Sequence, residues 1–168
     1  IWGSDEAAPY LRSVPCKFDE EEPWSSWIVE LPWKLLEDRI REKGEGTVLR
    51  SVTVIRRSES GAATALEAVS DKDSCIIENE YEIREFLAPV NCMITEKDGT
   101  ETAGGSLLPS AYFELERTQD GNLLVRGKGY GHGVGMSQTG ADKMAEQGYD
   151  YREILDYFFR NITVENLG

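Results

Sequence analysis

The chain of 168 residues predicts a single α+β domain with a mainly antiparallel sheet and a few short helices, two of them at the C-terminus. Three observations predict this class. Strand patterns and helical patterns are grouped along the chain rather than strictly alternating. Two strand patterns are joined by a short turn, as in a hairpin. The last quarter of the chain carries two helical patterns with clear boundaries.

The first element expected is a helix over 31–43. Pro32 suits its first turn, and Gly44 ends it. Three apolar side chains share one face of this helix: Leu35, Leu36 and Ile40. The shared face predicts that the helix covers part of the core.

A β-hairpin is expected next. Strand patterns cover 48–55 and 63–69, and the turn residues of 58–61 separate them. A second helix is expected over 79–88, because its apolar residues recur at helical spacing and Pro89 closes it.

Three further strands are expected in the middle of the chain. They lie near 91–96, 111–116 and 123–127. Asp-Gly pairs at 98–99 and 120–121 supply turns beside them.

The last helix has the clearest start. Asp150 and Glu153 have capping-box spacing, which predicts a helix over 151–160. A single apolar stripe runs along it: Ile154, Leu155, Phe158 and Phe159. We expect this stripe to pack in the core, so the helix is predicted to be structural rather than active.

The charge balance excludes one class of partner. The chain has 18 Lys and Arg residues against 31 Asp and Glu, a formal net charge of −13. Nucleic acid bound through its phosphates needs a basic face, so no nucleic-acid partner is expected. The acidic run 19–22 is expected to be a solvated loop. No run approaches the roughly 18 apolar residues of a membrane-spanning helix.

The cysteines predict neither a disulfide framework nor a metal site. Cys16, Cys75 and Cys92 are odd in number, widely spaced and without a Cys-x-x-Cys pair. One bridge between two of them is the most they could form. His132 is the only histidine, so this chain supplies no multi-histidine metal site. We therefore predict no metal site from this chain alone and no cofactor, and metal dependence stays open, because residues outside the chain could complete a site with any of these side chains.

One segment is unusual. Residues 126–141 read RGKGYGHGVGMSQTGA, with glycine at every second position from 127 to 135. In an extended strand this spacing leaves one face without side chains, so that a ligand or a second backbone can approach. Glycine costs roughly 0.5–1 kcal/mol inside a strand, so the run is expected to serve geometry or function. The spacing fits neither the dinucleotide-binding nor the Walker A motif, and Thr139 stands where a nucleophile elbow needs glycine.

The side chains of this segment are the candidate site. His132 is flanked by glycines on both sides, so we expect it to face a cleft and to act in function, with a purely structural histidine as the alternative. Tyr130 and Gln138 carry uncharged hydrogen-bonding groups of the kind that bind sugar hydroxyls. Ser137 has two interpretations: it caps a helix over 138–147, or it contacts substrate directly.

The chain resembles the stage II sporulation protein D (SpoIID) family and the related amidase enhancer LytB. The resemblance rests on motifs that run from one end of the chain to the other. They are APYLRSV at 8–14, LPSAYF at 108–113, GYGHGVGMSQTGA at 129–141, Met144-Ala145, and GYDYREIL at 148–155. The GHGVGMSQ core is specific to the family.

The resemblance implies a lytic transglycosylase that cuts the MurNAc–GlcNAc bond of bacterial peptidoglycan and leaves a 1,6-anhydro end. In the family the catalytic glutamate lies upstream of the PYLRSV segment, and this chain begins at Ile1-Trp2-Gly3. We therefore expect the chain to be the C-terminal part of such a domain, without the general acid, and nominate no carboxylate.

The remaining residues would then form the substrate-binding half of the cleft. His132 and Gln138 are predicted to support catalysis. The predicted substrate-binding residues are Tyr130, Ser137, Gly131, Gly133, Tyr10 and Arg12. For Tyr10 and Arg12 an ordinary strand or loop is an equal alternative. Sugar stacking or core packing could explain the four tryptophans: Trp2, Trp24, Trp27 and Trp33.

The partners implied by the resemblance are glycan strands stripped of stem peptides, a cell-wall amidase and membrane-anchored sporulation proteins, all outside the cytoplasm. The net charge of −13 agrees with this preference, because it repels the carboxylates of intact stem peptides. The alternative is an amidase-enhancer-like module that holds glycan or a hydrolase without cutting. A purely structural envelope protein is a third, weaker possibility.

Overall fold

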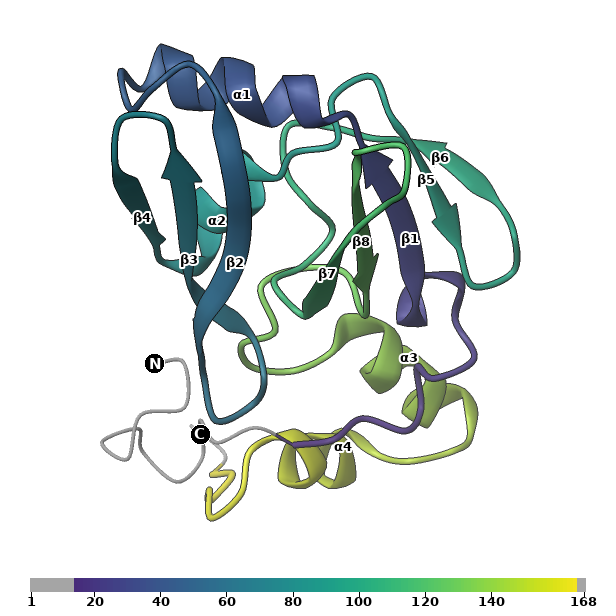
Figure 1. Cartoon of the computed structure of the whole chain (residues 1–168). Coiled ribbons are helices and arrows are strands. Elements are labelled where there is room, and N and C mark those ends of the chain that lie inside the picture. The colour runs from purple at the N-terminus through teal and green to yellow at the C-terminus, as the bar shows by residue number, and fades with distance from the viewer. Residues whose placement is uncertain (1–13, 166–168) are drawn as a thin grey trace.

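A computed structural model describes residues 14–165 as two antiparallel β-sheets side by side, with helices packed around them (Figure 1). The larger sheet contains, in order, β6 (Glu101–Ala103), β5 (Met93–Glu96), β1 (Trp27–Leu31), β8 (Leu123–Gly127) and β7 (Phe113–Arg117). The smaller one contains β2 (Leu49–Arg57), β3 (Ala63–Ser70) and β4 (Ser74–Glu78). The helices are α1 (Trp33–Glu42), α2 (Glu80–Phe86), α3 (Gln138–Glu146) and α4 (Tyr151–Phe158), preceded by a short 3-10 turn at Pro23–Ser25. This confirms the predicted α+β class.

Most predicted elements form close to their expected bounds. The β2–β3 hairpin, α1, α2, β5, β7 and β8 all appear. Asn79 caps α2 by accepting a hydrogen bond from the Glu82 backbone N–H. The prediction placed the first helix at Leu31, which was wrong: Leu31 is fully buried as the last residue of β1. Three short strands, β1, β4 and β6, were not predicted.

The core lies between the sheets and the two helices that cover them. α1 contributes Leu36 and Ile40, and β1 contributes Trp27, Val29 and Leu31, all buried. Burial of each such side chain contributes roughly 1.5–3 kcal/mol to folding. The burial of β1 alternates because successive side chains of a strand point to opposite faces, and one face of the larger sheet lies on the core.

Polar contacts join the two sheets at one end. The Ala63 backbone N–H donates to the Ala111 carbonyl at 2.8 Å. The Arg57 guanidinium donates to the Phe113 carbonyl at 2.8 Å and pairs with Glu114 at 3.0 Å. The start of β7 is therefore held against the β2–β3 hairpin, whose loop reaches toward the candidate site.

The helix α4 corrects the predicted core role. Its capping box forms as expected between Asp150 and Glu153. However, Phe158 is the only fully buried residue of α4, and the helix lies outside the core cluster. It packs instead on the described N-terminal segment, where Tyr157 donates to the Pro15 carbonyl at 2.8 Å and its ring meets Phe18 edge-on. The apolar stripe of α4 therefore packs outside the core of the sheets, with the described N-terminal segment beside the helix.

The three cysteines are unpaired, half-buried thiols, so the single bridge that the sequence allowed does not form. Burial raises the pKa of each thiol above its ordinary value. Within residues 14–165 no helix is long and apolar enough to cross a membrane.

Candidate functional site

The glycine-rich segment is not the extended strand that its spacing predicted. β8 ends at Gly127, and the chain from 128 to 137 is irregular. The backbone changes direction at every second residue, because the glycines there have positive φ, between 68° and 113°: Gly129, Gly131, Gly133 and Gly135. Residues with a Cβ rarely adopt this region, so the glycines serve backbone turns rather than a bare strand face.

Two glycines of the run are also required by close packing. A Cβ at Gly127 would lie 2.0 Å from Cζ2 of Trp27. A Cβ at Gly133 would lie 2.5 Å from the Tyr112 ring. At Gly129, Gly131 and Gly135 a Cβ would meet nothing within 4 Å. The run therefore meets two needs: close packing at 127 and 133, and a backbone of positive φ at 129, 131, 133 and 135.

Hydrogen bonds fix the first half of the segment to the body of the protein. The Trp27 indole donates to the Gly129 carbonyl at 2.9 Å, and the buried Ser110 hydroxyl donates to the Lys128 carbonyl at 2.6 Å. The Gly131 backbone N–H donates to the Pro109 carbonyl at 2.8 Å. The stretch 108–113 thus serves as a scaffold for the glycine-rich segment.

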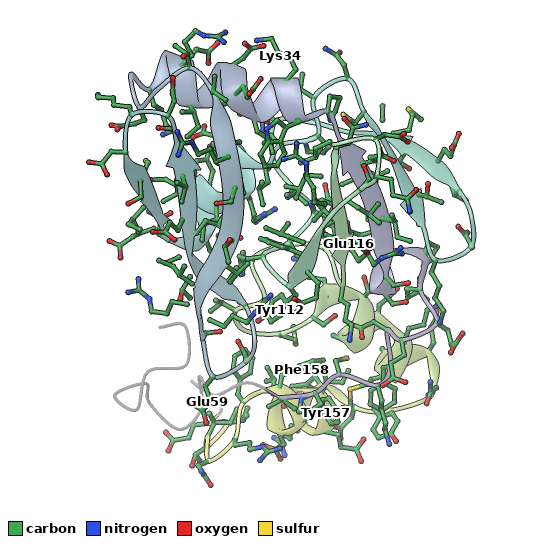
Figure 2. The ribbon with its side chains drawn as sticks, in the orientation of Figure 1. Lys34, Glu59, Tyr112, Glu116, Tyr157 and Phe158 are labelled. Atoms are coloured by element: carbon green, nitrogen blue, oxygen red, sulfur yellow. The ribbon has the colours of Figure 1, made fainter. Side chains whose placement is uncertain are left out.

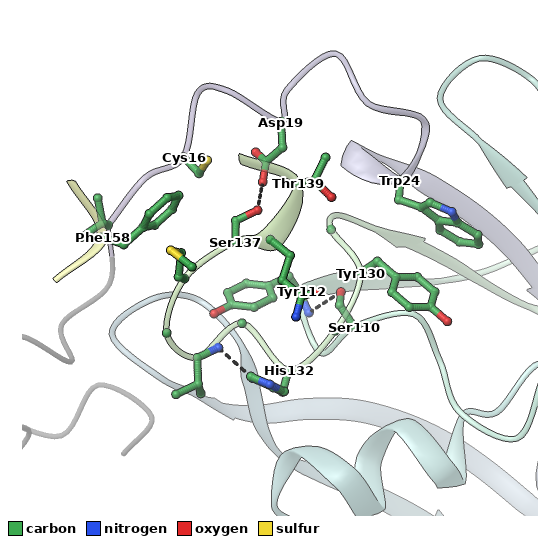
Figure 3. A pocket seen from close by; sticks show the side chains of 18 of the residues that line it. Cys16, Asp19, Trp24, Ser110, Tyr112, Tyr130, His132, Ser137, Thr139 and Phe158 are labelled. Carbon is green, nitrogen blue, oxygen red and sulfur yellow. Dashed lines mark hydrogen bonds between the residues drawn. The ribbon is translucent and has the colours of Figure 1, made fainter. Parts of the chain in front are cut away.

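A cavity of about 700 Å³ opens beside this segment (Figure 3). Its other walls are the described N-terminal segment, the β2–β3 loop and Phe158 of α4. Glu59 and Tyr112 lie on the side of the sheets that faces Phe158 (Figure 2). The cavity is lined by six of the predicted site residues: Tyr130, Gly131, His132, Gly133, Ser137 and Gln138. The functional roles assigned to them stay predictions, and Tyr10 and Arg12 lie outside the described residues.

His132 is exposed at the cavity and its ring is oriented by the loop. Nδ1 accepts a hydrogen bond from the Val134 backbone N–H at 3.0 Å. A neutral imidazole that accepts at Nδ1 carries its proton on Nε2. His132 therefore offers an Nε2–H donor to a ligand.

Ser137 is the N-cap of α3, which confirms one of its two interpretations. Its hydroxyl oxygen accepts from the Gly140 backbone N–H at 3.0 Å. The same hydroxyl donates to the Asp19 carboxylate at 2.7 Å, across 118 residues of sequence. Ser137 thus links α3 to the N-terminal segment, and contact with substrate stays a prediction.

The acidic run 19–22 is only in part the solvated loop that was expected. Glu20 and Glu21 are exposed. Asp19 and Glu22 are half-buried, and each has a partner in the α3 region: Ser137 for Asp19, and Lys143 at 3.5 Å for Glu22. These two carboxylates line the cavity, which the composition of the run did not indicate.

The described tryptophans divide between core and cavity. Trp27 is buried in the core, and Trp33 packs against it. Trp24 lines the cavity, and its ring meets that of Tyr130 edge-on with centroids 4.9 Å apart. Tyr130 is 72% exposed, so a large part of this aromatic pair is open to a ligand. Trp2 lies outside the described residues.

Together these groups suit a neutral, polyhydroxylated ligand. The cavity offers hydroxyl, amide and imidazole groups for hydrogen bonds and an aromatic pair for stacking on an apolar ring face. Sequence reasoning named neither Tyr112 nor Asp19 as a site residue, although Tyr112 lies in the LPSAYF motif that carries the resemblance. Trp24 was considered only with the other tryptophans, for which sugar stacking and core packing were the alternatives.

Comparison with known proteins gives the family. A family described as "Domain of unknown function (DUF8618)" matches residues 11–135, well over half of the chain. The chain belongs to this family. The DUF8618 match includes the scaffold stretch 108–113 and ends inside the glycine-rich segment.

Similar proteins carry names that agree with the resemblance found in the sequence. The DUF8618 chain is 42% identical to Stage II sporulation protein D of Bacillus subtilis over 158 residues, 94% of this chain and 38% of that protein. It is 28% identical to Stage II sporulation protein D of Bacillus amyloliquefaciens over the same shares. It is 38% identical to the Amidase enhancer of Bacillus subtilis over 61 residues, 36% of this chain and 8% of that protein. The predicted resemblance is confirmed, and the chain spans less than two fifths of the length of the sporulation proteins it matches.

Proposed function

We propose that the cavity binds glycan strands of bacterial peptidoglycan and that the chain forms the substrate-binding part of a lytic transglycosylase. One observation carries this proposal. The glycine-rich segment places Tyr130, His132, Ser137 and Gln138 around a single cavity of about 700 Å³, with Trp24 beside Tyr130. The names of the sporulation and amidase-enhancer relatives support a cell-wall role.

The proposed reaction needs one carboxylic acid and no water. The acid protonates the glycosidic oxygen, the C1–O bond breaks, and the C6 hydroxyl of the same sugar attacks C1. The carboxylate then takes the proton of that hydroxyl, which leaves a 1,6-anhydro ring. In this scheme His132 donates a hydrogen bond from Nε2 to the glycan, and the Gln138 amide forms hydrogen bonds with sugar hydroxyls. These bonds hold the glycosidic bond in position for cleavage.

The general acid is proposed to come from a part of the protein that this chain does not span. Among the described residues, three carboxylates line the cavity. Asp19 is bonded to the Ser137 hydroxyl and Glu22 pairs with Lys143, whereas Glu59 lies on the β2–β3 loop and is not proposed as the acid. The matched sporulation proteins are more than twice as long as the matched region, which leaves room for such a residue elsewhere. The whole protein would act outside the cytoplasm, with a cell-wall amidase and membrane-anchored sporulation proteins as partners.

The test compares the chain with the complete protein. Each is incubated with peptide-free glycan strands, and mass spectrometry looks for 1,6-anhydro-muramic ends. We expect product from the complete protein and only binding from the chain. His132→Ala in the complete protein should sharply reduce turnover at an unchanged melting temperature, and unchanged turnover would contradict the role of His132.

A matched pair of tyrosines tests the binding surface. Tyr130→Ala should weaken glycan binding by the chain about tenfold, which corresponds to the loss of about 1.4 kcal/mol of aromatic contact. Tyr81→Ala is the control, because Tyr81 is also exposed, at 56%, but lies on α2 away from the cavity. Equal effects of the two substitutions would contradict the proposal.

A second function is favoured by the similarity to the Amidase enhancer and by the engagement of Asp19 and Glu22. In this case the protein holds glycan or a hydrolase without cutting. The same incubation separates the two functions. Glycan bound by the complete protein without any anhydro product would favour the binding module.

A further inference from the structure

A second, smaller pocket lies at the seam between the two sheets, away from the glycine-rich segment. Its volume is about 130 Å³. It is lined by Trp33, Arg50, Ser51, Val52, Leu115, Arg117 and Leu123. An apolar cavity of about 150 Å³ holds a group the size of benzene, so this pocket fits one apolar side chain.

The seam is formed by two edge strands. β2 is at the edge of the smaller sheet and β7 at the edge of the larger one. Arg57 of β2 closes one end of the seam by bonding to Phe113 and Glu114 of β7. The pocket lies between the other ends, beside Arg50 and Arg117. Edge strands present backbone N–H and C=O groups that an extended peptide can use.

Two arginine side chains line this pocket, and packing on a tryptophan orients one of them. Arg117 stacks on Trp33, with Cζ 3.2 Å from the centroid of the ring. The Trp33 indole is itself fixed, because it donates to the Leu49 carbonyl at 3.0 Å. Arg50 lies at a shift in the β2–β3 register between Leu49 and Ser51, and a bulge of this kind turns a side chain out of the regular pattern.

Both guanidinium groups lack the carboxylate partner that several other arginines of the described residues have. Arg56, Arg84 and Arg126 each form an ion pair. Within residues 14–165 Arg50 and Arg117 form none, although the chain carries 31 acidic residues against 18 basic ones. A pair of unpartnered cations on an apolar pocket, in a protein of net charge −13, is complementary to a ligand that is both anionic and apolar.

We propose that this pocket binds the terminal carboxylate of a peptide whose last residue is apolar. The carboxylate lies between Arg50 and Arg117, where guanidinium groups offer paired N–H donors that match its two oxygens. The last side chain fills the apolar space lined by Val52, Leu115 and Leu123. The peptide backbone follows an edge strand of the seam.

The test uses acetyl-Gly-Leu as the probe and the indole N–H signal of Trp33 as the reporter, in NMR titrations of the whole chain. The acid should shift this signal on binding. The C-terminal amide of the same peptide should bind about tenfold more weakly, because it removes the charge that the arginines recognise. Isovalerate, a free acid with the same branched end, should also bind more weakly because it has no backbone.

Three arginine variants localise the effect. Arg117→Gln and Arg50→Gln should each weaken binding of the acid about tenfold. Arg126→Gln is the control, since Arg126 is exposed on β8, pairs with Glu116 at 3.9 Å and does not line the pocket. If Arg117→Gln unfolds the chain because it removes the stack on Trp33, the exposed Arg50 still provides the test.

Four results would overturn the proposal. The first is an unshifted Trp33 signal with acetyl-Gly-Leu, and the second is equal affinity for the acid and the amide. The third is equal loss of affinity in Arg50→Gln and Arg126→Gln. The fourth is equal binding of isovalerate and acetyl-Gly-Leu, which would show that the ligand is not a peptide terminus.

Discussion

The two sheets and the cavity region are held in shape by different interactions. In the sheets, apolar side chains from β1, β2, β3, β8 and the helices α1 and α2 fill a common core. In the cavity region, the chain from 128 to 137 has no regular structure and is fixed by separate polar contacts. Three of these contacts span large sequence distances: Trp27 to Gly129, Ser110 to Lys128, and Asp19 to Ser137.

Because of this difference, substitutions in the two regions should affect stability and ligand binding differently. A change in the sheets removes buried apolar contacts and lowers the free energy of unfolding. A change in the cavity region removes one hydrogen bond or one backbone turn, which is worth less in stability but alters the geometry that a ligand meets. Substitutions in the sheets should therefore lower the free energy of unfolding more than substitutions in the cavity region.

Leu66→Ala should lower the free energy of unfolding by about 2–5 kcal/mol, because Leu66 is fully buried on the central strand of the smaller sheet. Denaturant titration measures the loss. Ile76→Ala on the neighbouring strand is the control, since Ile76 is 47% exposed and should cost roughly 0.5 kcal/mol or less. Equal costs would contradict the assignment of the core.

Gly127→Ala and Gly131→Ala compare the two regions within one glycine run. Gly127→Ala should cost about 3 kcal/mol, because the new Cβ would lie 2.0 Å from the buried Trp27 ring. Gly131→Ala should cost about 1 kcal/mol, because the new side chain meets open space and only the positive φ is unfavourable.

Thermal and denaturant unfolding of the two glycine variants give the ranking, and glycan binding gives the second readout. Gly131→Ala should weaken binding more than its small stability cost suggests, since Gly131 lines the cavity. If Gly131→Ala lowers the free energy of unfolding as much as Gly127→Ala does, the glycine-rich segment is packed as tightly as the sheets, which would contradict the division between the two regions.

The fold could be predicted from the sequence where a pattern is long and local. The hairpin, α2 and the capping box of α4 follow from residues a few positions apart, and all form. The strand β1 was missed because its alternating apolar residues, Trp27, Val29 and Leu31, form only a short pattern. Leu31 was also assigned to the helix that follows two residues later. The strand β6 has only three residues, too few for a pattern.

The candidate site could be predicted only in its local part. The glycine run pointed to Tyr130, His132, Ser137 and Gln138, and these residues line one cavity. The predicted extended conformation of the glycine run was wrong. Glycine at every second position is compatible both with a strand that has one bare face and with a series of turns at positive φ, so the spacing alone could not distinguish them. Asp19 could not be found, since its partner Ser137 is 118 residues away and no periodic pattern connects them.

The link between Asp19 and Ser137 should give a smaller effect than the core substitutions. Ser137→Ala removes the N-cap of α3 and should cost about 1 kcal/mol. Asp19→Ala leaves the cap but frees the N-terminal segment. A double-mutant cycle should give a coupling of about 0.5–1 kcal/mol, and additive losses would contradict a direct contact in solution.

The smallest expected effect is a pH dependence of stability that arises at Asp71, beside the smaller sheet. The Asp71 carboxylate accepts hydrogen bonds from the backbone N–H groups of Thr47 and Val48, at 2.8 and 3.1 Å, and from the Thr47 hydroxyl. These bonds, that of the Thr47 N–H first, lower the pKa of Asp71 from 3.8 to about 2. Because the pKa is lower in the folded state, the contribution to stability is present above about pH 4 and is lost as the pH falls toward 2. The melting temperature of the parent chain should therefore exceed that of Asp71→Asn at pH 5 to 7, and the two should converge as the pH approaches 2. A difference that stays constant down to that pH would show that the hydrogen bonds persist with the protonated acid, and the carboxylate charge would then have no part in joining the 47–48 loop to the smaller sheet.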